Sequence, residues 1–217
     1  MANVVVLGGH GKVALLLAPL LVARGDGVTA VVRNPDHESD VAATGARPVV
    51  ADIEELDVDG LADLIRGHDA VVWSAGAGGG SPTRTFAVDR DAAVRSIDAA
   101  VSAGVQRYVM VSYLGARADH VVPADDPFHA YAEAKAAADE HLRGSSLAFT
   151  VLGPGRLTLD EPTGRIDVVT SRDAGDNHVT RADVAAVVAA ALVEEATVGR
   201  TIGFRNGETP IAEAIRA

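Results

Sequence analysis

Three side chains in the second half of the sequence have the types and spacing needed for proton transfer. Tyr131 and Lys135 are four residues apart, so on a helix they share one face. The ammonium would then lie beneath the phenol, lower its pKa and hold the ribose of a nicotinamide. Ser112 follows an apolar run and could bind the same substrate oxygen. A Tyr-x-x-x-Lys spacing is common by chance, but with this upstream serine it predicts an acid/base group for carbonyl reduction or alcohol oxidation.

A glycine-rich turn near the N-terminus predicts a dinucleotide phosphate site. The apolar run 4–7 is typical of a strand buried on both faces, and the glycines after it let the backbone turn and approach a ligand. The following helix would offer free N–H groups and the positive end of its dipole to a pyrophosphate. Ala14 is small enough for this helix to lie close to the strand. The residues expected to contact the cofactor here are Gly8, Gly9, His10, Gly11, Lys12, whose charge would lie near the phosphates, and Val13.

The residue after the next predicted strand indicates which dinucleotide binds. Sites for NAD usually have an Asp or Glu there to accept from the ribose 2′-hydroxyl, whereas a cation suits the 2′-phosphate of NADP. Here Arg33 follows the strand, with no carboxylate beside it in the sequence. We therefore expect NADP(H) as the preferred cofactor, with NAD(H) possible. The alternative is that Arg33 is a solvated side chain at a strand end.

Further cofactor contacts are expected after the third and fourth strands. Asp52 could accept a hydrogen bond from the adenine amine while Ile53 packs against the ring, although Asp52 is equally suited to capping a turn. The small residues Ser74, Ala75 and Gly76 would let the backbone pass close to the ribose and the nicotinamide.

Apolar strands alternate with helical patterns along the chain, and this alternation must position the residues above. It is typical of βαβ units and a parallel sheet, in which ligands bind outside the carboxyl ends of the strands. The predicted strands are 4–7, 28–32, 48–51, 70–73, 107–111 and 148–152, with shorter ones at 166–169 and 201–204. The predicted helices are at about 12–24, 36–44, 57–66, 84–103, 128–143 and 182–195. We expect one doubly wound, mostly parallel α/β domain over residues 1–217, with helices on both faces.

The composition narrows the classes of partner. With 48% hydrophobic but only 4% aromatic residues, the chain suits an Ala/Val/Leu-rich core. Its net charge of −11 argues against a nucleic-acid surface. We expect the partner to be a small-molecule substrate. The absence of cysteine excludes disulfides, Cys-ligated zinc and thiol catalysis, and the histidines lack metal-ligand spacing. No apolar run reaches the roughly 18 residues of a membrane span and no signal peptide is recognisable, so we expect a cytoplasmic monomer or homodimer.

The sequence resembles the short-chain dehydrogenase/reductase superfamily, and within it the compact atypical members with NmrA-like or biliverdin/flavin-reductase-like domains. The resemblance covers nearly the whole chain and depends on residues 8–11, 32–35, 51–53, 104–112, 131 with 135, and 179–185. It implies a Rossmann-type domain that binds NADP(H) or NAD(H). It also implies that Tyr131 is the acid/base, Lys135 its partner and ribose anchor, and Ser112 the donor to the substrate oxygen. Pro154 would lie in a turn against the nicotinamide.

The residues named above are consistent with three functions. The first is an NADP(H)-dependent oxidoreductase that transfers a hydride between the nicotinamide and a small carbonyl, imine or flavin-like substrate. The second is a redox-sensing module of NmrA-like type that binds NADP(H) without turnover. The third is a reductase that stacks a planar ring in its cleft, with Tyr131 incidental. Epimerase or dehydratase chemistry on a nucleotide sugar is disfavoured, because the extended relatives that perform it have a substrate lobe for which this chain has no room.

Overall fold

The computed structural model describes residues 1–79, 81–170 and 177–217 of the chain. The strands are β1 (Asn3–Leu7), β2 (Gly27–Val32), β3 (Arg47–Val50), β4 (Ala70–Trp73), β5 (Arg107–Val111), β6 (Ala148–Pro154), β7 (Arg156–Thr158), β8 (Arg165–Val168), β9 (His178–Thr180), β10 (Arg200–Asn206) and β11 (Thr209–Pro210). The helices are α1 (Lys12–Ala23), α2 (Glu38–Ala43), α3 (Val58–Ile65), α4 (Pro82–Thr85), α5 (Ala93–Ala103), α6 (His129–Arg143), α7 (Arg181–Ala191) and α8 (Ile211–Ala214). A π-helical segment (Phe86–Ala92) joins α4 to α5, and 3₁₀ turns lie at Pro35–His37 and Glu195–Thr197.

Within the described residues a nine-stranded sheet has the order β11-β8-β10-β6-β5-β4-β1-β2-β3, and β7 pairs with β9 separately. The strands from β3 across to β10 run parallel, whereas β8 pairs antiparallel with both β10 and β11. The chain order reverses at β1, which pairs with β2 on one side and with β4 on the other. Such a switch point opens a crevice at the carboxyl ends of the strands. The predicted mostly parallel, doubly wound sheet is therefore confirmed.

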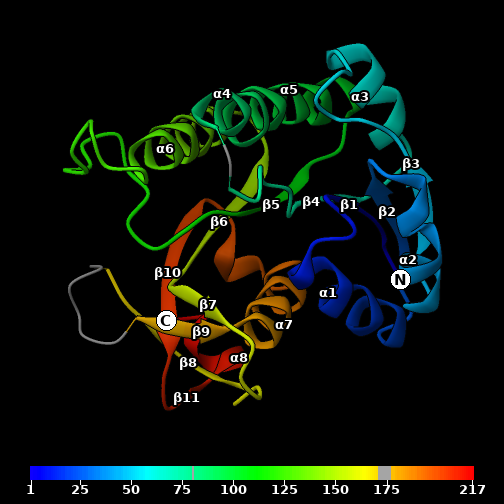
Figure 1. The fold of residues 1–217 in the computed structure, drawn as a ribbon. Helices are drawn as coiled ribbons and strands as arrows, with labels where there is room; N and C mark the ends of the chain where they lie inside the picture. Colours follow the sequence, from blue (N-terminus) through cyan, green and yellow to red (C-terminus); the bar gives the residue numbers. More distant parts are fainter. Residues whose placement is uncertain (80, 171–176) are drawn as a thin grey trace.

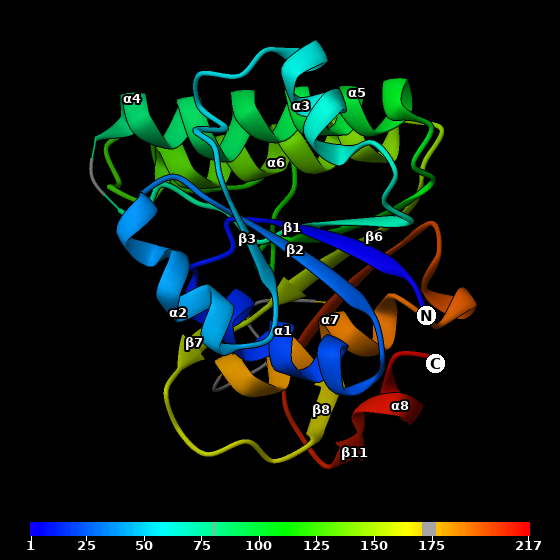
Figure 2. The same cartoon turned by 90° about the vertical axis from the view of Figure 1, so that its right-hand side faces the viewer.

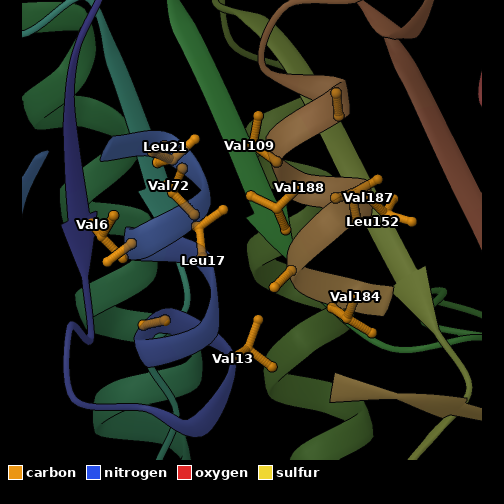
Figure 3. Packing of buried hydrophobic residues seen from close by; sticks show 14 of the residues in the cluster. Val6, Val13, Leu17, Leu21, Val72, Val109, Leu152, Val184, Val187 and Val188 are labelled. Atoms are coloured by element: carbon orange, nitrogen blue, oxygen red, sulfur yellow. The ribbon is translucent and has the colours of Figure 1, made fainter. Parts of the chain in front are cut away.

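Helices cover both faces of the sheet (Figures 1 and 2). Alternate residues of β1 face opposite sides: Val4 and Val6 pack with α1 and α7, whereas Val5 and Leu7 pack with α3 and α5. Figure 3 shows the first of these two cores, in which α1 and α7 lie side by side on the strands. Its labelled members are Val6, Val13, Leu17, Leu21, Val72, Val109, Leu152, Val184, Val187 and Val188. These branched side chains pack α1 and α7 against the sheet and against each other.

The predicted strands are all present, with their ends moved by at most two residues. The single helix predicted at 84–103 is wrong in part, because the π-helical segment interrupts it, and the helix predicted at 182–195 ends at Ala191. β7, β9, β11 and α8 were not expected, since two to four residues carry too little periodicity to be recognised. Among the described residues, none of the helices has the length and apolar character needed to cross a membrane.

Candidate functional site

The turn between β1 and α1 is built on glycines that lie against neighbouring strands. Gly8 has a left-handed φ of 88°, and a Cβ there would lie 2.6 Å from the Cα of Ala75. A Cβ on Gly9 would lie 2.7 Å from the Cβ of Ala30. Gly11 caps α1 without a side-chain hydrogen bond. The first N–H groups of α1 therefore have no side-chain cap and remain available to an anion.

A cavity of about 270 Å³, which we call the glycine-turn cavity, opens beside this turn. It brings together most of the predicted cofactor contacts, namely Gly8, His10, Gly11, Arg33, Asp52, Ile53, Ser74, Ala75 and Gly76. Gly9 does not line it and acts instead through its close approach to Ala30. The Oδ1 atom of Asp52 accepts from the N–H of Glu54 at 2.9 Å, so Asp52 also stabilises its own turn.

Arg33 is not a free cation, which the sequence did not reveal. Its Nη1 atom lies 2.7 Å from Oε1 of Glu54, and Nη2 of Arg84 lies 3.0 Å from the same oxygen. Arg84 also donates from Nη1 to the carbonyl of Ala77 at 2.8 Å. Both arginines and the glutamate line the glycine-turn cavity. Two positive charges therefore share the Glu54 carboxylate at the edge of the glycine-turn cavity.

His10 has its own partners at the edge of the same cavity. Its Nε2 atom lies 2.9 Å from Oδ2 of Asp40, and its ring stacks on that of His37 at 3.6 Å between centroids. Both histidines line the glycine-turn cavity. These contacts hold the glycine turn against the segment that follows β2.

A larger cavity of about 690 Å³, which we call the tyrosine cavity, continues from the first one. The two share Gly11, Ser74, Ala75 and Gly76. The tyrosine cavity also contains Lys12, Val13, Ser112, Tyr131 and Lys135. The structure thus brings the predicted proton-transfer residues to the same cleft as the glycine turn.

Lys135 does not have the effect on Tyr131 that its spacing predicts. The lysine is 2% exposed, and its Nζ donates to the carbonyl of Val111 at 2.9 Å. The pKa of Tyr131 is raised, first by burial and then by the carboxylates of Asp89 and Asp139. The expected lowering of this pKa is therefore wrong, and the phenol is held in its protonated form.

Ser112 is bonded to a carboxylate that the sequence analysis did not single out. Its Oγ donates to Oδ2 of Asp139 at 2.6 Å, and both side chains are buried. Burial raises the pKa of Asp139 to about 6, while the charge of Lys135 and the bond from Ser112 oppose that rise. The signal available in the sequence was position, because Asp139 lies four residues after Lys135 on the same helical face.

Asp89 is a second buried carboxylate beside Lys135. It lies in the π-helical segment and is 1% exposed. Its Oδ2 accepts from the N–H of Ala77 at 3.0 Å, and its Oδ1 lies 3.9 Å from Nζ of Lys135 without a hydrogen-bond partner in the described chain. Burial raises its pKa, against the opposing charge of Lys135. π-Helical segments are frequent at functional sites.

Pro154 lies away from the glycine turn, in a third cavity. This cavity, which we call the aromatic cavity, has a volume of about 310 Å³. Tyr131 and Phe128 line both the aromatic and the tyrosine cavities, so the two adjoin. The lining of the aromatic cavity includes Tyr113, Leu114, Phe128, Tyr131, Pro154 and Arg156.

The chain is similar to a described protein family and to several named proteins over nearly its whole length. Residues 8–195 match the family described as NAD(P)H-binding. The chain is 33% identical, over 99% of both chains, to YhfK of Bacillus subtilis (strain 168), which is named an uncharacterized sugar epimerase. A solved structure from Bacillus halodurans, provisionally named an NAD-dependent epimerase/dehydratase, is 34% identical over 99% of both chains with a TM-score of 0.91. The oxidoreductase ylbE from Lactococcus lactis is 27% identical, with 98% of this chain and 94% of that chain covered and a TM-score of 0.86.

Proposed function

The chain belongs to the NAD(P)H-binding family, and on this premise we propose that it is an NADP(H)-dependent oxidoreductase of the atypical short-chain dehydrogenase type. It would transfer a hydride between the nicotinamide and a small carbonyl, imine or flavin-like substrate. The main observation in support is that Tyr131 and Lys135 line a cavity that shares Gly11 and Ser74 with the glycine-turn cavity. An acid/base group therefore lies along the path that a bound dinucleotide would take.

The polar groups around the glycine turn suit an anionic dinucleotide. The uncapped N-terminus of α1 supplies N–H donors, and Lys12 adds an ammonium close to them. Asp52 and Ile53 lie across the cavity, where the first would accept from the adenine amine and the second would pack on the ring. Ser74, Ala75 and Gly76 would border the ribose and the nicotinamide, as these residues line both cavities.

In a reduction, the bound cofactor would supply the hydride to the carbonyl carbon of the substrate. Tyr131, whose phenol is protonated at neutral pH, would give its proton to the carbonyl oxygen. Burial and the nearby carboxylates raise its pKa, so it is a weaker acid than a free phenol until a bound ligand changes its surroundings. Lys135 would hold a ribose hydroxyl while its Nζ remains bonded to the carbonyl of Val111. Ser112 would donate to the same substrate oxygen from the end of β5 when Asp139 is protonated, because the ionised Asp139 accepts the hydrogen bond of that hydroxyl.

NADP(H) is the dinucleotide that the charged groups favour. The guanidiniums of Arg33 and Arg84 lie at the edge of the glycine-turn cavity, where a 2′-phosphate would find two donors. Glu54 competes for both of them, and its carboxylate is also a group that could accept from the 2′-hydroxyl of NAD(H). The preference for NADP(H) over NAD(H) therefore depends on how easily a 2′-phosphate replaces Glu54 as the partner of Arg33 and Arg84.

A non-catalytic NADP(H)-binding module is the second candidate. It is favoured by one observation, namely that the side chains of Lys135 and Ser112 are already bonded within the protein. An epimerase, the activity in the name of YhfK, is less well supported. The nine-stranded sheet and the helices on it account for most of the described chain, and no separate substrate lobe is built from those residues.

The first experiment is a calorimetric titration of the protein with NADPH and, separately, with NADH. We expect micromolar binding of NADPH and much weaker binding of NADH. A screen of carbonyl, imine and flavin substrates would then follow the loss of NADPH absorbance. If neither dinucleotide bound below about a millimolar, both the oxidoreductase and the sensor would be excluded; tight binding without turnover on any substrate would favour the sensor.

A further inference from the structure

The aromatic cavity gathers side chains that the hydrophobic core does not use. The chain has only one tryptophan, three tyrosines and four phenylalanines, and its core consists mainly of Ala, Val, Leu and Ile. Two of the tyrosines and one phenylalanine nevertheless meet in this cavity. Ring centroids lie 5.2 Å apart for Tyr113 and Phe128, 5.4 Å for Tyr113 and Tyr131, and 5.2 Å for Phe128 and Tyr131. Rings grouped in this way offer a stacking surface to a further flat ring.

A cation without an internal partner lies at the same cavity. Arg156 is exposed, and within the described chain its guanidinium has neither a hydrogen bond nor an ion pair, although its backbone N–H donates to the carbonyl of Asn177 at 2.6 Å. Several other arginines of this acidic protein form ion pairs, as Arg24 does with Asp26 and Arg33 with Glu54. An unpaired guanidinium beside an apolar cavity is suited to bidentate binding of a carboxylate.

We propose that the aromatic cavity binds a planar aromatic carboxylate as the substrate, with the ring system against Tyr113, Phe128 and Tyr131 and the carboxylate on Arg156. This inference rests on the proposed oxidoreductase function, because Tyr131 is the side chain that would join the ring-binding site to the proton-transfer site. The cavity volume of about 310 Å³ is at the lower end of the range for small-molecule sites, which favours a compact ring system.

The net charge makes this assignment more specific. At −11 the protein as a whole repels anions, so an anionic substrate needs a local cation to bind. The rings would supply apolar contact to neutral and anionic ligands alike, whereas Arg156 would favour only the anionic ones. The two contributions can therefore be separated with a pair of ligands that share a ring system and differ in charge.

The test is a calorimetric titration with 2-naphthoate and with the neutral 2-naphthalenemethanol. The variant is Arg156→Gln, and the matched control is Arg66→Gln, which removes the same charge from the exposed end of α3, where Arg66 contacts Asp63. We expect Arg156→Gln to weaken 2-naphthoate about tenfold or more without changing 2-naphthalenemethanol. Arg66→Gln should change neither. A second variant, Phe128→Ala, should weaken both ligands, because it removes part of the stacking surface.

The proposal would be overturned by absent binding of 2-naphthoate, or by equal binding of 2-naphthoate to the protein and to Arg156→Gln. NADPH titration of the same samples keeps this outcome separate from the proposed function. NADPH binding without 2-naphthoate binding would reject the aromatic carboxylate alone. Binding of 2-naphthoate without NADPH binding would reject the oxidoreductase while leaving the ring and carboxylate contacts in place. Intact NADPH binding by Arg156→Gln would also show that this variant is folded.

Discussion

Ser112 and Asp139 are joined by a 2.6 Å hydrogen bond between the end of β5 and the middle of α6. Both side chains are buried, and the Oδ1 atom of Asp139 has no hydrogen-bond partner in the described chain. When Asp139 is ionised it accepts the hydrogen bond that the serine hydroxyl donates, so Ser112 can only accept from a ligand. When Asp139 is protonated, it can donate to Ser112 and free that hydroxyl to donate. The protonation state of the buried Asp139 carboxyl thus decides whether the Ser112 hydroxyl can donate a hydrogen bond to a ligand.

The pKa of Asp139 predicts a pH dependence of stability. Its pKa of about 6 in the folded protein lies above the value of about 3.9 in an unfolded chain, so the folded state binds more protons between these pH values. Stability should therefore fall as the pH rises from about 4 to about 6, by up to roughly 3 kcal/mol from this group. Asp139→Asn should remove that contribution from the free energy of unfolding measured in urea.

The control for this measurement is Asp63→Asn, a change at a highly exposed carboxylate. It should leave the slope of stability against pH unchanged. Asp89, whose pKa burial also raises, would maintain part of the slope in Asp139→Asn. Identical slopes for the unmodified protein and Asp139→Asn would contradict the raised pKa of Asp139.

Tyr131→Phe tests whether the phenol transfers a proton. The change removes the hydroxyl and retains the ring that contacts Tyr113 and Phe128. We expect turnover of a substrate found by the NADPH screen to fall about a hundredfold or more, with the NADPH dissociation constant unchanged. Unchanged turnover would instead favour the reductase that stacks a planar ring and does not need the hydroxyl.

Arg33→Gln and Glu54→Gln should shift the cofactor preference in opposite directions. Loss of Arg33 removes a charged hydrogen bond to a 2′-phosphate and should weaken NADPH by about tenfold, with little effect on NADH. Glu54→Gln releases Arg33 and Arg84 from their shared carboxylate, so it should tighten NADPH binding several-fold. Dissociation constants from calorimetry check both, with Arg66→Gln as the charge control. Weaker NADPH binding by Glu54→Gln would mean that the carboxylate itself serves the cofactor.

Gly8→Ala and Gly67→Ala separate backbone strain from close contact. The two glycines have similar left-handed φ values of 88° and 81°, but a Cβ at Gly8 meets Ala75 at 2.6 Å whereas nothing lies within 4 Å of one at Gly67. Gly67→Ala should lower the free energy of unfolding by about 1–2 kcal/mol and leave NADPH binding intact. Gly8→Ala should destabilise more and abolish NADPH binding, because the β1–α1 turn must move away from Ala75. Equal losses of unfolding free energy and equal NADPH binding in the two variants would show that the contact of Gly8 with Ala75 is unimportant.

The sequence was sufficient to predict the sheet and the location of the cleft. The apolar runs 70–73 and 108–111 predicted strands at 70–73 and 107–111 with the observed ends, since buried parallel strands require apolar side chains on both faces. The partners of the site residues were not predictable in the same way. Glu54 meets Arg33 after β2 and Arg84 from α4, and Asp139 reaches Ser112 from α6. Such pairings depend on how the elements are placed in three dimensions and leave no local pattern.

The π-helical segment Phe86–Ala92 makes the position of Asp89 sensitive to the loss of a single residue. A π turn spans one residue more than an α turn, so deletion of one residue there would allow a continuous α-helix to replace the whole of α4 to α5. The flanking helices would keep their orientation, because the lost residue is the extra one of the π turn. Residues within the segment would point in new directions, and the Asp89 carboxylate would leave its place beside Lys135. The sheet and the glycine turn need not change. Deletion of a single codon would therefore give a protein that still binds the dinucleotide but has lost the environment of Lys135.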